Sequence, residues 1–515
     1  MAPPDYGYGY PDSDSDGEDE ESVEEMAPPP DYGYGYPDSD SDGEDEESVE
    51  EKGRQLPPAP PAYGYPDEDG GAQRPPFVLI DPRAYFADRD NATTAVCEMD
   101  GPSLTGRLKV TFCAVAPPLV SYFCVHATRM DHTEFHVTPH ILATETDGGL
   151  VLLCVATRDG DHHTDFLRPR NCHYFVYDAL SRKLDRLPLP GFQHRLNEPS
   201  LAIMRKPSKN TRSSPHPHGH GHGDAEAEAH HFVVAAQSYS FWRGKSPHLC
   251  IYDSATKTWS NKPVVMGSSY PEVHITGKTL AIGGSNGTVA WVDLWRNIVF
   301  CDVLVKRPKL GYLKLPSAPD MEPPFEGRSL RDIAVVGDTI KYVDMLPHPD
   351  ASPSLHWMAT AWSIKKARRS WPKEWHMECK LDSTRIMVDA ARTVATFPTL
   401  SSLCVGLPTL SLQNDAIVYF LAKIDFSPSQ HTAWVLAVDM KNETAEQVVE
   451  YPAERTYCVA QGYDASRISA YLQPAPGTQQ IPKRPGVLLM KCPSKKHSKD
   501  VEDPKEDDAM VISSS

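Results

Sequence analysis

A recurring strand–turn–strand pattern constrains the fold of this chain more than any other feature of the sequence. Four copies have an apolar segment that ends in Tyr-Asp or Val-Asp, then about five turn residues, then a second apolar segment. Two short strands joined in this way are typical of a β-hairpin. The four copies occupy 173–190, 248–263, 290–304 and 433–451, and a fifth copy with a longer turn occupies 360–377.

The aspartates hold the same position in the four copies. In each copy, the aspartate that ends the first strand lies six positions before the corresponding residue of the second strand. A carboxylate at the end of a strand can accept hydrogen bonds from the backbone N–H groups of the turn. We therefore predict a structural role for these aspartates. The pairs are Asp178 with Leu184, Asp253 with Trp259, Asp293 with Val299, and Asp439 with Ala445.

Another hairpin-like pair lies upstream of each of these hairpins, for example at 273–287, 331–345 and 410–424. Four short strands per unit, repeated about five times, are typical of propeller blades. The sequence therefore predicts an all-β chain with a single β-propeller-like domain of the kelch or F-box-associated type. Five blades are expected to start near residues 138, 199, 273, 330 and 409.

A sixth blade is expected to combine both ends of the domain. It would join 467–474 to the N-terminal strands at 77–86 and 109–115, which closes the ring and removes exposed sheet edges. A seven-bladed ring or two separate β domains are the alternatives. In a propeller we expect three tryptophans to pack between blades rather than to hold a cofactor: Trp259, Trp291 and Trp295.

Composition divides the chain into a folded body and polar appendages. Residues 1–51 hold 20 Asp and Glu and no Lys or Arg, and residues 1–25 are repeated almost unchanged at 26–51. Such a segment buries too little apolar surface to fold. The expected domains are a disordered acidic arm (1–74), a propeller body (75–490) with a disordered His-rich insert (206–231), and a disordered tail (491–515).

The distribution of charge along the chain indicates which kinds of partner the protein can attract. Without the arm, the remaining residues carry 51 basic and 50 acidic side chains, so the body is nearly neutral. A neutral body with an acidic arm gives no electrostatic attraction to nucleic acid. We expect no nucleic-acid or membrane partner, an unknown protein partner, and a monomer rather than an obligate oligomer.

The appendages contain candidate sites. The alternating histidines of the insert could chelate zinc or nickel transiently, although no rigid frame holds them: His216, His218, His220 and His222. The arm has serines with an acidic residue three positions later, as acid-directed kinases prefer: Ser13, Ser15, Ser22, Ser39, Ser41 and Ser48. No cofactor and no catalytic residue is expected, because the sequence has no GxSxG, HExxH or phosphate-loop motif.

The cellular location is predicted from cysteines and from the N-terminus. The 11 cysteines form no CxxC pair, and most lie in apolar runs, which is typical of buried thiols rather than of a disulfide scaffold. The first residues show no basic and apolar signal sequence. We expect a cytoplasmic or nuclear protein that is not secreted.

Two stretches also resemble a known family. WVDLWRNIVFCDVL (291–304) and RDIAVVGDTIKYVDM (331–345), with upstream similarity at 77–95 and 110–128, resemble the domain of unknown function numbered 1618. The resemblance spans about 77–490, with a core at about 291–400. It implies a plant protein from a family abundant in grasses, with no established activity, ligand or catalytic residue to transfer to this chain.

Three functions are compatible with these observations. The leading hypothesis is a non-enzymatic scaffold that binds a protein partner, with the acidic arm modulating that contact. An enzyme of hydrolase type is the first alternative, because residues from different blades can converge in a propeller channel. Three or more unpaired Asp, Glu or His side chains in one pocket would favour it. The second alternative is metal binding through the His-rich insert.

Overall fold

Nearly all of the regular structure in the computed structural model is β-strand. The described helices are one short α-helix, α2 (Gly327–Leu330), and isolated 3-10 turns. One compact unit spans Pro57–Ser515, and the other, Met1–Leu56, contains no described residue. The structure describes residues 57–64, 74–100, 104–158, 172–191, 196–207, 231–238, 247–266, 274–317, 326–347, 355–365, 374–424, 432–456 and 462–472.

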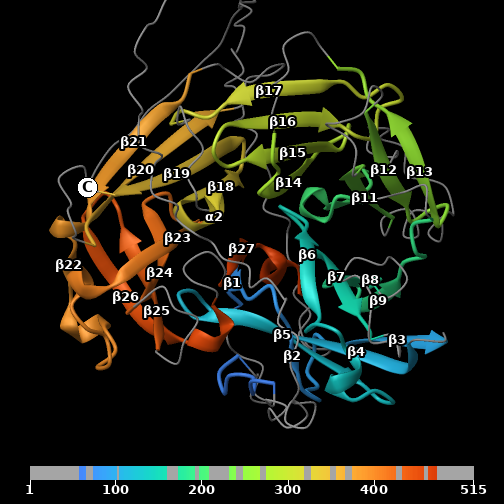
Figure 1. Cartoon of the computed structure of the whole chain (residues 1–515), viewed down its shortest axis with the longest axis horizontal. Coiled ribbons are helices and arrows are strands. Elements are labelled where there is room, and N and C mark those ends of the chain that lie inside the picture. The colour runs from blue at the N-terminus through green and yellow to red at the C-terminus, as the bar shows by residue number, and fades with distance from the viewer. Residues whose placement is uncertain are drawn as a thin grey trace, which may run out of the picture. The chain divides into compact units, whose positions relative to one another are not determined.

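The described strands form six sheets arranged as blades around a common centre (Figure 1). Each of the first four blades has four antiparallel strands in chain order, with the first strand innermost. Blade 1 contains β6 (His140–Thr144), β7 (Leu150–Ala156), β8 (Cys172–Asp178) and β9 (Lys183–Arg186). Blade 2 contains β10 (Ala202–Arg205), β11 (Phe232–Gln237), β12 (His248–Asp253) and β13 (Thr258–Pro263). Blade 3 contains β14 (Lys278–Gly283), β15 (Thr288–Asp293), β16 (Asn297–Asp302) and β17 (Leu310–Lys314).

Blade 4 also has four strands, whereas blades 5 and 6 carry additional ones. Blade 4 contains β18 (Arg331–Val336), β19 (Thr339–Pro347), β20 (Trp357–Lys365) and β21 (His376–Asp382). Blade 5 contains β23 (Cys404–Leu410), β24 (Ile417–Lys423), β25 (Ala433–Asp439) and β26 (Thr444–Tyr451), with the short β22 (Met387–Val388) outside β26. Blade 6 contains β1 (Val78–Ile80), β2 (Tyr85–Phe86), β3 (Ala95–Asp100), β4 (Thr105–Cys113), β5 (Val120–Ala127) and β27 (Asp464–Ser466). The six-bladed propeller expected from the sequence is thus confirmed.

Burial differs between the middle and the outer strands of the blades. Every residue of β7 and of β25 is buried, because neighbouring blades cover both faces of these strands. This explains why they read as continuous apolar runs rather than as alternating ones. The outer strand β13 is mostly exposed or half-buried.

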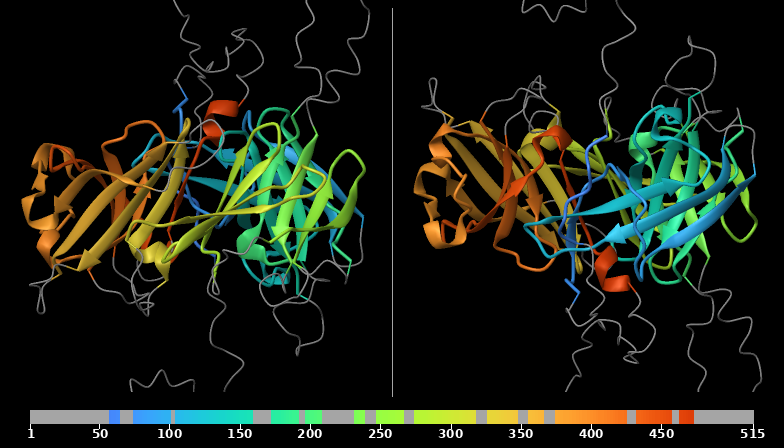
Figure 2. Two further views of the ribbon diagram at one scale, coloured as in Figure 1. Left: turned by 90° about the horizontal axis from the view of Figure 1, so that it is seen from above. Right: turned by 90° about the horizontal axis from the view of Figure 1, so that it is seen from below.

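The ring closes by pairing the two ends of the described body. β27 pairs antiparallel with β1, and Val78 lies opposite Ser466. The two side views show the blue N-terminal and the red C-terminal segments together (Figure 2). The closing strand ends just before the segment expected from the sequence, and Ile468–Tyr471 forms a 3-10 turn instead.

Three of the four aspartates end the third strand of a blade and cap a four-residue turn. In blade 1, Oδ1 of Asp178 accepts from the backbone N–H of Leu180 at 2.9 Å. Asp253 in blade 2 accepts in the same way from Ala255. Asp439 in blade 5 accepts from two successive turn N–H groups. These carboxylates therefore satisfy turn donors that would otherwise have no partner in the hairpin.

Asp293 belongs to a different hairpin. It ends β15, the second strand of blade 3, and pairs directly with Asn297, so its turn has three residues instead of four. Its carboxylate accepts from the N–H of Trp295 at 3.0 Å. The segment 290–304 therefore has the same sequence pattern as the other copies but forms the second and third strands of its blade instead of the third and fourth. This shift by one strand accounts for the short spacing between Asp253 and Asp293.

The three tryptophans singled out in the sequence contact neighbouring blades. The indole N–H of Trp291 donates to the carbonyl of Ser200, just before β10 of blade 2, at 2.7 Å. That of Trp259 donates to Pro188 of blade 1. Trp295 stacks under the guanidinium of Arg331 in blade 4, with Cζ 4.3 Å from the ring centroid. Each tryptophan therefore links two blades.

The predicted appendages lie outside the described residues. These are most of the arm 1–74, nearly all of the insert 206–231, and the tail 491–515. The candidate histidines and the candidate serines of these segments are among the undescribed residues. In the part of the chain that the structure does describe, no helix is long and apolar enough to span a membrane.

Candidate functional site

The centre of the ring contains two adjoining cavities. The first has a volume of about 240 Å³ and is lined by residues from the innermost part of all six blades. The second, of about 250 Å³, lies where α2 and the segment before β27 meet. Both cavities are lined by Pro82, Gly277, Lys278 and Asp464. The two cavities therefore adjoin at Lys278 and Asp464, and together they are called the channel below.

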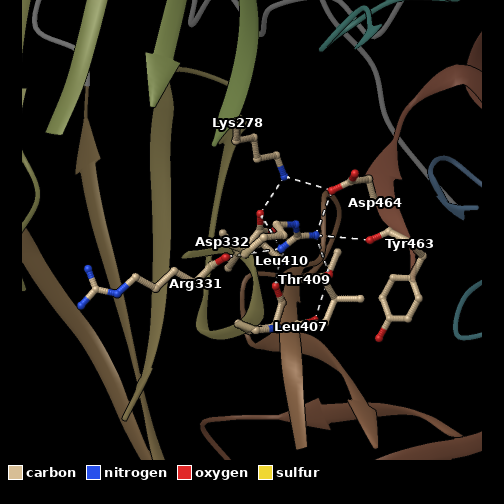
Figure 3. Close-up of polar contacts among 10 residues, drawn as sticks. Lys278, Arg331, Asp332, Leu407, Thr409, Leu410, Tyr463 and Asp464 are labelled. Atoms are coloured by element: carbon tan, nitrogen blue, oxygen red, sulfur yellow. Dashed lines mark hydrogen bonds and ion pairs between the residues drawn. The ribbon is translucent and has the colours of Figure 1, made fainter. Parts of the chain in front are cut away.

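Four charged side chains from three blades converge at this junction, and Figure 3 labels three of them, Lys278, Asp332 and Asp464. Nζ of Lys278, the first residue of β14, lies 2.6 Å from Oδ1 of Asp332 and 3.6 Å from Oδ1 of Asp464. Arg328 of α2 lies 3.2 Å from the same oxygen of Asp332 and 2.8 Å from that of Asp464. Two cations and two carboxylates make this channel cluster neutral as a whole.

The fifth blade supplies further hydrogen bonds to the channel cluster. The backbone N–H of Leu410 donates to Oδ2 of Asp332 at 2.9 Å. Arg328 donates to the carbonyl of Pro408 at 2.8 Å and to the hydroxyl of Thr409 at 3.1 Å. Since the side chain of Asp332 is 0% exposed, these partners are what permits a charge at this depth.

A backbone irregularity places β23 against the channel cluster. The register of β23 shifts between Gly406 and Thr409, and Leu407 has a φ of 49°. A bulky residue in this left-handed region costs about 1–3 kcal/mol, which the surrounding packing must offset. Gly462 lies beside it, and a Cβ there would come within 2.9 Å of Cδ2 of Leu407, so the leucine side chain would have to shift. Bulges of this kind commonly re-aim a strand near a site.

The charges around Asp464 determine its ionisation. Burial opposes the charged form of Asp464, but Arg328 and Lys278 outweigh burial and lower the pKa of the carboxyl. Burial likewise opposes the charge of Arg328, and the two aspartates raise its pKa. The carboxylate of Asp464 is therefore ionised at neutral pH, with 48% of its side chain exposed to the channel.

Glu145 lies elsewhere on the wall of the first cavity, just after β6. Burial raises its pKa from 4.5 to about 6, although the backbone N–H of Arg205 donates to it at 2.8 Å and the Arg205 guanidinium lies near. Arg205 in turn pairs with Asp178. Glu145 is thus tied to the β6–β7 turn and to blade 2 rather than free in the channel.

The channel does not contain three unpaired acidic or histidine side chains among the described residues. Asp464 is paired, Glu145 accepts two backbone hydrogen bonds, and Glu326 at the mouth is exposed. Within that part of the chain, no group of three or more His, Cys, Asp or Glu could hold a metal ion. The arrangement can bind polar groups.

A larger hollow lies at the side of the ring. A groove of about 910 Å³ runs between blade 5 and the proline turn Pro117–Pro118 of blade 6. A row of paired residues on three strands, Tyr419, Ala437 and Gln447, forms part of its lining. Arg392 and Glu446, 2.7 Å apart, border it. The groove is therefore open, and both charge signs and apolar surface line it.

Two pairs of thiols lie side by side on neighbouring strands. Cys113 is two residues from Thr111, the partner of Cys124, so both thiols face the same side of the sheet. A hydrogen bond from Cys124 and the nearby Arg89 lower the pKa of Cys113 despite its burial. Cys154 and Cys172 are related in the same way in blade 1. None of the nine described cysteines is in a disulfide.

Sequence reasoning did not find the channel cluster. Lys278, Arg328, Asp332 and Asp464 are spread over nearly 190 positions, and each stands in an ordinary local context. Their one shared signal is position, because Lys278 and Asp464 begin innermost strands and Asp332 is second in its strand. The aspartates and tryptophans that the sequence did single out lie in turns and between blades instead.

The family comparison covers part of the body. The sequence model of the family described as "Protein of unknown function (DUF1618)" matches residues 291–419. This span begins at Trp291 and includes blade 4, and it is shorter than the 77–490 expected from the resemblance. Arg328 and Asp332 of the channel cluster lie inside it, whereas Lys278 and Asp464 lie outside. No curated protein matches the chain.

Several solved propellers are weakly similar. The β-propeller domain of Cps50 (Swd1) from Myceliophteria thermophila is 10% identical, with 61% of this chain and 89% of that chain covered and a TM-score of 0.26. The xyloglucan-locus GH43B of Bacteroides ovatus is 11% identical, with 61% of this chain and 56% of that chain covered and a TM-score of 0.26. A polysaccharide lyase, the PL25 ulvan lyase, is 12% identical, with 67% of this chain and 72% of that chain covered and a TM-score of 0.27. Likenesses at this level carry no information on activity.

Proposed function

We propose that this protein is a non-enzymatic propeller scaffold of a plant cell that binds a protein partner in the cytoplasm or nucleus. The proposal includes a monomeric body, no nucleic-acid or membrane partner, and an acidic arm that modulates the contact. The observation that carries this proposal is the pairing of the charged side chains in the channel. Lys278, Arg328, Asp332 and Asp464 pair with one another there, and an ion-pair network of this kind has a structural role in many proteins.

The channel cluster has a structural explanation that fits a scaffold. Lys278 comes from blade 3, Arg328 and Asp332 from blade 4, and Asp464 from blade 6. Removing one member would leave a buried charge without its partner, which costs several kcal/mol in proteins. The cluster thus holds the blades in fixed positions, as a platform for binding requires.

The side groove is the surface that we propose for the partner, and its occupant would be an extended peptide segment. The chain already places an extended segment of its own beside the groove, where Met387 and Val388 pair in parallel with β26. Farther along, Thr393 forms a parallel bridge to Val448. The mixed lining of the groove suits side chains of both kinds on such a peptide.

Filling the groove tests this proposal. Gln447 is exposed in the lining on an outer strand, so the substitution Gln447→Trp should occupy the groove without disturbing the fold. Lys380→Trp adds the same side chain to an exposed position of β21 in blade 4 and serves as the matched control. The full-length wild type and both variants would be used for affinity purification from the native tissue.

We expect a partner that the wild type and Lys380→Trp recover and that Gln447→Trp does not recover. A partner that Gln447→Trp retains equally would overturn the groove as its binding site. If none of the three proteins recovers a specific partner, the scaffold proposal itself fails, and hydrolase activity in the channel becomes the better hypothesis.

A further inference from the structure

The channel cluster leaves two polar groups facing the cavities. Within the described part of the chain, the contacts of Asp464 all go to Oδ1, so Oδ2 has no hydrogen-bond partner (Figure 3). Nζ of Lys278 has three donor positions and two carboxylate partners. An acceptor oxygen and an ammonium donor thus lie next to each other at the junction of the two cavities.

The charge of the channel cluster restricts what could bind there. Since two cations and two carboxylates cancel, a charged ligand would gain no net attraction and would still lose its hydration. A neutral ligand with neighbouring hydroxyls meets both demands, because each hydroxyl can donate to the carboxylate and accept from the ammonium.

The walls and the size of the channel fit the same chemistry. Beside Lys278 and Asp464, aliphatic side chains such as Leu280, Ile333 and Ile141 line the first cavity. Such walls suit the C–H faces of a compact polyol ring. Volumes of about 240 and 250 Å³ together fall in the range of ligand pockets, about 300–1,000 Å³.

We infer that the central channel binds a small, neutral polyhydroxylated molecule, with Asp464 Oδ2 and Lys278 Nζ holding one pair of its hydroxyls. This binding site is independent of the groove that we propose for a protein partner. The rigid blades around it would supply a preformed pocket, so little ordering is needed on binding.

The test compares neutral and anionic ligands of one shape. Glucose, myo-inositol and glucuronate would be titrated into the full-length protein and followed by ligand-observed saturation-transfer NMR. In the wild type we expect both neutral compounds to bind, and glucuronate to bind no more tightly than glucose. Asp464→Asn should weaken glucose about 10- to 100-fold, as expected for the loss of a hydrogen bond to a charged group.

Asp464→Asn should also reverse the preference between neutral and anionic ligands. In the Asp464→Asn protein the cluster would carry one net positive charge, so glucuronate should then bind more tightly than glucose. Asp338→Asn, which changes an exposed aspartate on the β18–β19 turn, is the matched control and should behave as the wild type. The thermal unfolding midpoint of each variant shows that it is folded.

Two results would overturn the inference. The first is a wild-type protein to which no neutral polyol binds at about 50 mM, a concentration well above a Kd of about 1 mM. The second is a folded Asp464→Asn protein that keeps the glucose affinity and the charge preference of the wild type, since the hydroxyls would then be held elsewhere.

Discussion

At the residue scale, the repeated turn contains a strained position. Arg182, Lys257 and Glu443 each lie four residues after the aspartate of their hairpin and have φ values of 53–56°. This left-handed conformation disfavours residues with a Cβ. Asn297, the corresponding residue after Asp293, does not show it, which agrees with the shorter turn there.

We predict that Lys257→Gly stabilises the protein by up to about 1 kcal/mol, because glycine adopts this conformation without a Cβ penalty. Lys257 is exposed, so no packing is lost. The free energy of unfolding would be measured in urea. Ala255→Gly, two residues earlier and with a negative φ, is the control and should cost about 0.4–1 kcal/mol. A loss of stability in both variants would contradict the strain argument.

The raised pKa of Glu145 predicts a pH dependence of stability. Its pKa is about 6 in the folded protein against an ordinary value of 4.5, because the side chain is buried. The folded state therefore binds more protons than the unfolded state between these values. Glu145 thus stabilises the fold when protonated, and this contribution is lost as the pH rises from about 4.5 to about 6.

Glu145→Gln removes the titrating group and keeps a hydrogen-bond acceptor for the backbone N–H of Arg205. Between pH 4.5 and 6.5 the unfolding free energy of the variant should fall by about 1.5 kcal/mol less than that of the wild type. Denaturant unfolding of both proteins at the two pH values measures it. Parallel pH profiles of the two proteins would refute the assignment.

At the scale of elements, tryptophans join blades through their indole N–H groups. Trp259, Trp291 and Trp375 donate to Pro188, Ser200 and Lys314, each in the preceding blade. The three hydrogen bonds are similar in length, at 2.7 to 2.9 Å. They differ in burial, because Trp291 is 0% exposed whereas Trp375 is half-buried.

Burial should decide what each of these hydrogen bonds contributes. We predict that Trp291→Phe destabilises the protein by about 2–4 kcal/mol, since it leaves a buried carbonyl without a donor and opens a cavity. Trp375→Phe should cost about 1 kcal/mol or less, because water can replace its partner. Urea unfolding compares the two variants, and equal costs would show that burial is not the deciding factor.

The elements could largely be predicted from the sequence. Periodicity and turn residues identified the hairpins, and the expected blade starts lie within five residues of His140, Ala202, Lys278, Arg331 and Cys404. The exceptions have local reasons. The sequence pattern at 290–304 fits the hairpin of the second and third strands of a blade as well as that of the third and fourth, so its place could not be predicted. The three-residue β27 is too short to show an alternation of apolar and polar residues.

The channel cluster could not be predicted in this way. An aspartate that begins a three-residue strand, such as Asp464, reads as a loop residue, and Lys278 follows a turn glycine. Their proximity results from ring closure, which brings residues 186 positions apart to within 3.6 Å. Local patterns contain no information on contacts of this range.

At the scale of the whole molecule, the ring depends on a latch between its two ends. Besides the β1–β27 pairing, Nε of Arg455 lies 2.8 Å from Oδ2 of Asp81, and both residues are almost fully buried. The guanidinium also stacks on Tyr85, with Cζ 4.1 Å from the ring centroid, and donates to the carbonyl of Ala84 at 3.3 Å. The latch therefore combines an ion pair with cation–π and backbone contacts.

We predict that Arg455→Met destabilises the ring by about 3–5 kcal/mol. The methionine fills much of the space, but the carboxylate of Asp81 stays buried without its cation. Urea unfolding would measure the cost, and limited proteolysis should detect earlier cleavage near the two ends of the body. A change below about 1 kcal/mol would mean that β1–β27 pairing alone closes the ring.

The double variant Asp81→Asn with Arg455→Met separates the ion pair from the packing. Asparagine keeps an acceptor for the hydroxyl of Tyr451, which lies 3.2 Å from the Asp81 carboxylate, and removes the buried charge. Because an unpaired buried charge costs more than a neutral pair, the double variant should be more stable than Arg455→Met alone. If the two losses simply add, the latch acts through its packing on Tyr85, and the charges at this seam of the propeller contribute little to its closure.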